Sequence, residues 1–142
     1  MTIMSDPIVE PLSVLCEEAG IPMPTPDDRG GYEFVIDYKT LRVSSLNRGS
    51  KIVLLGIIGN AESIAEQRRE ARERLLTSCL TLQAVRFGKL GSREVLTLEP
   101  ENGELVLWVA FENYSISIPG FIAAVESLLN ELDFWKNWLS AH

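Results

Sequence analysis

The residue types that could perform catalysis are few in this sequence. The only histidine, His142, is the last of 142 residues, where a catalytic base would be poorly held. Cys16 and Cys79 have no second cysteine or histidine at the spacing of a metal site. Gly56 and Gly59 follow a strand-like run but lack the lysine and the third glycine of a phosphate-binding loop. These positions predict no catalytic triad, no zinc site and no nucleotide-binding loop.

Carboxylates and tryptophans are the next candidates for chemistry. Asp27, Asp28 and Asp37 could hold a divalent ion, but all three occupy turn-forming stretches, so turn formation explains them better. Trp135 and Trp138 could stack on a sugar or a base. Trp135 falls on an apolar helical stripe and is expected in the core, whereas Trp138 is expected to be partly exposed at a contact surface. We therefore expect a protein that is not an enzyme and needs no metal or cofactor; a small hydrolase is a distant alternative.

The composition is that of a folded globular protein. Hydrophobic residues make up 46% of the chain and charged residues 23%, and the length suits one domain over residues 1–142. The formal net charge is -7, which makes nucleic acid an unfavourable partner. Arginines and glutamates interleave over residues 66–74, a pattern typical of a solvated helix face.

The sequence also bears on the compartment. The first residues, MTIMSDPIVEP, lack a basic region followed by an apolar stretch, and no run approaches the ~18 apolar residues of a membrane span. The two cysteines lie far apart at apolar positions of helix-like segments, which favours reduced, packed thiols. We expect a cytoplasmic protein without membrane insertion.

Hydrophobic periodicity predicts an α+β fold of order αβββαββα, with a twisted antiparallel sheet packed by helices. Ser5 or Asp6 is expected to cap the first helix and Gly20 to end it. Asn102-Gly103 is the strongest hairpin signal, and Ser117 is a plausible cap of the last helix. The predicted helices are 8–19, 61–87 and 119–139, and the predicted strands are 32–37, 41–46, 51–58, 93–99 and 104–111.

Two predicted strands carry apolar residues on both faces. In Lys51–Ile58 and Leu105–Phe111, successive side chains point to opposite sides of the sheet, yet almost all are apolar. Both faces of the sheet must therefore be covered. The chain's own helices could supply this cover, or a second subunit or a bound protein could bury the surplus.

The order of these elements and several segments together resemble the class I type III secretion chaperones of the Tir-chaperone family. The segments that carry the resemblance are 12–21 (LSVLCEEAGI), 32–37 (YEFVID), the middle helix leading to Leu75-Leu76, 102–107 (NGELVL) and 121–139 with its late Trp135. The resemblance spans Ile8 to Leu139. It departs from the family in the second half of the middle helix and in the proline-rich linker 22–26.

The resemblance implies a homodimer in the bacterial cytosol that binds an extended segment of a secreted effector protein and keeps it secretion-competent. The same fold also serves regulatory proteins that sequester an anti-activator, which is the alternative function. By the resemblance, the middle helix and the following strand form the dimer interface, with candidate residues Leu75, Leu76, Cys79, Leu80 and Val95.

Client binding is expected beside the first helix and across the sheet. Tyr32, Phe34 and Ile36 share one strand face, which is expected to be the core face because its side chains are heavier. Lighter residues are then left for the client, and the candidate client-binding residues are Leu12, Leu15, Val35, Val43 and Val53.

Overall fold

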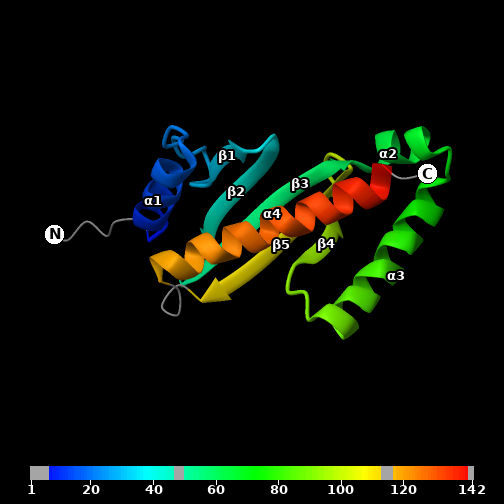
Figure 1. Cartoon of the computed structure of the whole chain (residues 1–142). Coiled ribbons are helices and arrows are strands. Elements are labelled where there is room, and N and C mark those ends of the chain that lie inside the picture. Colours follow the sequence, from blue (N-terminus) through cyan, green and yellow to red (C-terminus); the bar gives the residue numbers. More distant parts are fainter. Residues whose placement is uncertain (1–6, 47–49, 113–116, 141–142) are drawn as a thin grey trace. The chain divides into compact units, whose positions relative to one another are not determined.

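The computed structural model describes residues 7–46, 50–112 and 117–140. It confirms the predicted α+β class and the antiparallel sheet (Figure 1). The five strands lie in the order β1-β2-β3-β5-β4. The elements are α1 (Val9–Ala19), β1 (Tyr32–Ile36), β2 (Lys39–Leu46), β3 (Lys51–Asn60), α2 (Ala61–Arg68), α3 (Arg72–Leu90), β4 (Val95–Leu98), β5 (Glu104–Glu112) and α4 (Ile118–Ser140).

The chain divides into two compact units. One contains the described residues as far as Leu55 and the stretch from Ala110 to Ser127; the other contains Gly56–Val109 and the described residues from Leu128 onward. Strands β3 and β5 and helix α4 therefore contribute residues to both units.

In the first unit, α1 buries one apolar stripe. Leu12, Leu15 and Cys16 are buried, and the helix ends at Gly20, whose φ of 70° lies in the left-handed region that favours glycine. The predicted stop is thus confirmed. The predicted caps, Ser5 and Asp6, lie outside the described residues.

Strands β1 and β2 form an antiparallel hairpin around a two-residue turn. Ile36 pairs with Lys39, so the turn consists of Asp37 and Tyr38, rather than of Tyr38 to Thr40 as the sequence suggested. Tyr32 and Phe34 are buried, which confirms the predicted core face of β1.

In the second unit, α4 packs directly on β3. A Cβ atom built at Gly56 would lie 2.5 Å from Leu132 Cδ1, so a larger residue at this position would force the Leu132 side chain to move. Ile58 on the strand and Leu128 and Trp135 on the helix are buried as well. The Asn102-Gly103 turn joins β4 and β5 as predicted, with φ of 70° at Gly103.

The predicted middle helix is two helices. Asn60 caps α2 through its side-chain oxygen, which accepts a hydrogen bond from Ser63 N at 3.0 Å. The chain leaves the helix at Arg69, whose φ is 53°, and α3 begins at Arg72 (Figure 1). Next to the break, α2 makes a tertiary contact. Arg68 donates hydrogen bonds to the carbonyls of Trp138 and Leu139 at 3.3 and 3.0 Å, which holds α2 against the end of α4.

Candidate functional site

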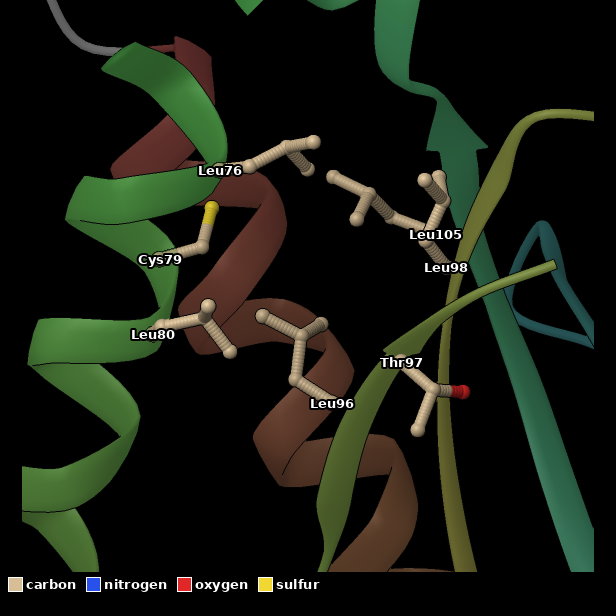
Figure 2. Close-up of a pocket in the computed structure, with 7 residues that line it drawn as sticks. All are labelled: Leu76, Cys79, Leu80, Leu96, Thr97, Leu98 and Leu105. Atoms are coloured by element: carbon tan, nitrogen blue, oxygen red, sulfur yellow. The ribbon is translucent and has the colours of Figure 1, made fainter. Parts of the chain in front are cut away.

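An apolar pocket of about 120 Å³ lies in the second unit between α3 and the β4–β5 hairpin (Figure 2). Leucines from both sides supply most of its wall, together with one thiol and one threonine. The lining residues are Leu76, Cys79, Leu80, Leu96, Thr97, Leu98 and Leu105. None of these side chains carries a charge, so the pocket suits apolar side chains and offers no acid or base.

Helical and strand periodicity together build the pocket. Leu76 and Leu80 are one helical turn apart on α3, so they lie on the same face. On β4, Leu96 and Leu98 point toward α3, whereas Thr97 points away from it, as strand alternation requires (Figure 2).

A polar contact closes part of the sheet edge beside the pocket. The side-chain oxygen of Gln83 in α3 accepts a hydrogen bond from the backbone N–H of Leu96. Because β4 is the last strand in the order, this N–H would otherwise be available to an added strand. Extension of the sheet at Leu96 is therefore blocked by α3 itself.

Arg86 ties α3 to α4. Its guanidinium forms an ion pair with Glu131 and lies 3.6 Å from the centre of the Phe134 ring. The ion pair and the ring contact hold the α3 face that carries Arg86 against α4.

The outer side of α3 carries exposed apolar residues. Leu80, Phe87 and Leu90 are all exposed, at 59%, 40% and 66%. Their separations of seven and three residues place them along one side of the helix. This row continues outward from the pocket, because Leu80 belongs to both.

The two thiols are unsuited to nucleophilic chemistry. Burial raises the pKa of Cys79 to about 11, Arg68 lowers it to a smaller extent and Glu70 raises it. Burial also raises the pKa of Cys16. Both cysteines are unpaired and protonated at neutral pH, so they act as small apolar side chains.

The predicted dimer residues are partly gathered at this pocket. Leu76, Cys79 and Leu80 line it, whereas Leu75 is fully buried. Val95 neighbours Leu96 on β4 and therefore points to the other side of the sheet. Sequence reasoning missed Leu96, Leu98 and Leu105, although strand alternation in 95–98 was a signal for the first two.

The predicted client residues are dispersed. Val35 is 52% exposed and Val53 is half-buried, whereas Leu12, Leu15 and Val43 are buried. The expected grouping of Val35 with Val43 on one face is wrong, because Val43 lies opposite Tyr32 and shares its buried face. A turn at residues 38–40 would pair Val35 with Val43, but the two-residue turn shifts the register and moves Val43 to the other face.

Asp27 acts as a turn former, as predicted. Its Oδ1 accepts hydrogen bonds from the backbone N–H groups of Arg29 and Gly31, both at 2.9 Å, and its Oδ2 pairs with Arg42. The Gly31 bond, together with Arg42 and Arg29, lowers the pKa of this carboxyl. No group of three or more potential metal ligands occurs among residues 7–46, 50–112 and 117–140.

The two tryptophans have structural partners. Trp135 is buried as predicted, and its ring meets that of Trp138 edge-on, with 5.7 Å between centroids. Trp138 is half-buried, and the Arg68 guanidinium covers its ring at 5.3 Å. A face already occupied by arginine is unavailable as a stacking platform.

In the part of the chain that the structure describes, no helix is long and apolar enough to cross a membrane.

Comparison of the whole fold with solved structures finds protein complexes, two of which contain a named chaperone. ExsC in complex with ExsE matches with a TM-score of 0.72 at 16% identity, covering 97% of each chain. The complex of the chaperone SchA with the effector HopA1 matches at 0.69 and 19% identity, covering 96% of this chain and 99% of the other. The Yersinia pestis type III secretion chaperone SycH, bound to a fragment of YscM2, matches with a TM-score of 0.55 at 14% identity, covering 87% of this chain and 95% of the other. At these identities the similarity establishes the fold.

Comparison of the sequence alone is less informative. No protein-family profile matches the chain, and no curated protein matches it.

Proposed function

We propose that this protein is a type III secretion chaperone of the Tir-chaperone type, which binds an extended segment of an effector protein in the bacterial cytosol. The observation that carries the proposal is the similarity of the fold, over 96% of this chain and 99% of the other, to a chaperone held in complex with its effector. The exposed apolar surface and the protonated thiols support a protein that binds a partner rather than one that catalyses a reaction.

The physical basis of such binding is burial of apolar surface. An extended segment covers exposed apolar side chains and gives up its own conformational entropy on binding. No covalent step and no nucleotide are required. The pocket beside α3 and the exposed row that begins at Leu80 supply apolar surface of the required kind.

We assign the second-unit surface to a homodimer. Leu76 and Leu80 lie at the pocket, and Phe87 and Leu90 extend the apolar row, so a second copy of α3 would bury all four. Because Gln83 closes the sheet edge at Leu96, the two copies would associate through side chains there rather than through a continuous sheet.

We assign client binding to the first unit. Val35 offers the exposed apolar side chain there and Val53 a half-buried one. Leu12, Leu15 and Val43 are buried in the chain's own core, so they are not available to a client in this structure.

Copurification from the native host, followed by mass spectrometry, tests the function. We expect the wild-type protein to retain a secreted effector, and Val35→Asp to remain folded and lose it. Thr25→Asp is the control for the added charge, since Thr25 is exposed and lies outside the sheet. Capture of a regulator of secretion genes would establish the alternative function. Turnover of a substrate by the purified protein would contradict both.

A further inference from the structure

A short turn joins β1 and β2 (Figure 1). It contains Tyr38, a residue type that the backbone geometry of this turn disfavours. Asp37 and Tyr38 have φ values of 50° and 65°. Positive φ at both central residues defines the type I′ hairpin turn, in which asparagine, aspartate and glycine are preferred. Asp37 suits the first position. A tyrosine at the second is strained, because its Cβ crowds the backbone in the left-handed region.

The folded chain does not compensate this strain through Tyr38. Its side chain is 97% exposed, the highest value among the exposed large hydrophobic residues that the structure describes. The neighbouring Lys39 supports the turn instead, since its Nζ donates to the carbonyl of Asp37 at 3.5 Å. An exposed aromatic ring in a strained backbone is typical of a residue that acts on something outside the chain.

We propose that Asp37 and Tyr38 form a recognition tip for an arginine or lysine side chain of the bound client. The ring of Tyr38 offers a face for a cation, and the adjacent carboxylate of Asp37 offers an ion pair to the same group. Charge complementarity favours such a partner, because the chain carries a formal net charge of -7. The proposal rests on the proposed client binding and adds the chemistry that the client must present.

The substitution Tyr38→Gly separates stability from binding. Glycine relieves the left-handed strain, so the melting temperature should rise by about 3 °C. The same change removes the ring, so the affinity for the copurified client should fall about tenfold. Tyr38→Phe keeps both the ring and the strain, and should bind within about twofold of the wild type.

A peptide probe tests the cation directly. A short peptide alternating arginine with valine should shift the amide resonances of Asp37 and Tyr38, and its counterpart with citrulline in place of arginine should not. Asp37→Asn should weaken the binding of the arginine peptide. It should also make that binding less dependent on salt concentration, because one ion pair is lost.

Three outcomes would overturn the inference. One is unchanged client affinity in Tyr38→Gly; the second is equal binding of the citrulline peptide. The third is a change of oligomeric state in Tyr38→Gly, which would assign the tip to a second copy of this chain. If no client copurifies, the proposed function fails. The two peptides still test whether Asp37 and Tyr38 bind a cationic side chain.

Discussion

Gln83 caps an edge amide of the sheet, because its side-chain oxygen accepts the hydrogen bond of Leu96 N–H. This one contact links α3 to β4 at the wall of the apolar pocket. It also leaves the face of α3, rather than the strand edge at this point, for the proposed dimer contact.

Gln83→Ala should destabilise the protein. The N–H of Leu96 would lose its partner at a half-buried edge, which costs about 1–3 kcal/mol in the free energy of unfolding. Urea denaturation measures this loss. Gln67→Ala in α2 is the control, because Gln67 is exposed and its removal should change stability by less than about 0.5 kcal/mol. Equal effects of the two substitutions would contradict the role of Gln83.

Leu80→Asp should separate the subunits without unfolding them. Leu80 is 59% exposed in the single chain, so a carboxylate there is hydrated in the monomer but buried in a dimer built on α3. Light scattering should give twice the 15.8 kDa chain mass for the wild type and the chain mass itself for the variant.

The matched control for this prediction is Leu75→Asp. Leu75 is fully buried in the chain, so this variant should lose several kcal/mol and unfold. A wild-type protein that scatters as a monomer at micromolar concentration would refute the dimer.

Arg68→Ala should loosen the junction between α2 and the end of α4. The substitution removes two hydrogen bonds to the carbonyls of Trp138 and Leu139 and the cation over the Trp138 ring. We expect a loss of about 1–3 kcal/mol together with a change in tryptophan fluorescence. Arg74→Ala, at an exposed position on α3, should alter neither measurement.

Asp27 should make stability depend on pH in the acid range. Its pKa is lowered in the folded state, chiefly by the Gly31 N–H, so the ionised form stabilises the fold. This contribution is present above the ordinary aspartate value and is lost as pH falls through the lower folded pKa. The difference in melting temperature between the wild type and Asp27→Asn should therefore shrink on acidification.

Local pattern predicted most of the elements, and long-range contacts explain what it missed. The buried face of β1 was predicted correctly, because Tyr32 and Phe34 are the larger side chains of that strand. The break at Arg69 did not follow from the periodicity, and neither did the contact beside it, in which Arg68 bonds to a carbonyl about seventy residues away. The face of Val43 was wrong because the position of one turn sets the register of the whole hairpin.

The pocket was only half predictable for a related reason. Helical spacing brings Leu76 and Leu80 together from sequence alone. Their partners Leu96 and Leu98 come from a strand whose placement against α3 depends on tertiary packing.

Direct binding of the purified protein to the copurified effector segment tests the central claim. Calorimetry with the wild type should show saturable binding, and circular dichroism should show that the bound segment gains neither helix nor a folded core. Val35→Asp should abolish the heat of binding, while Thr25→Asp, at an exposed position outside the sheet, should preserve it. Absence of binding by the wild type, or a segment that binds only in its folded form, would contradict the account.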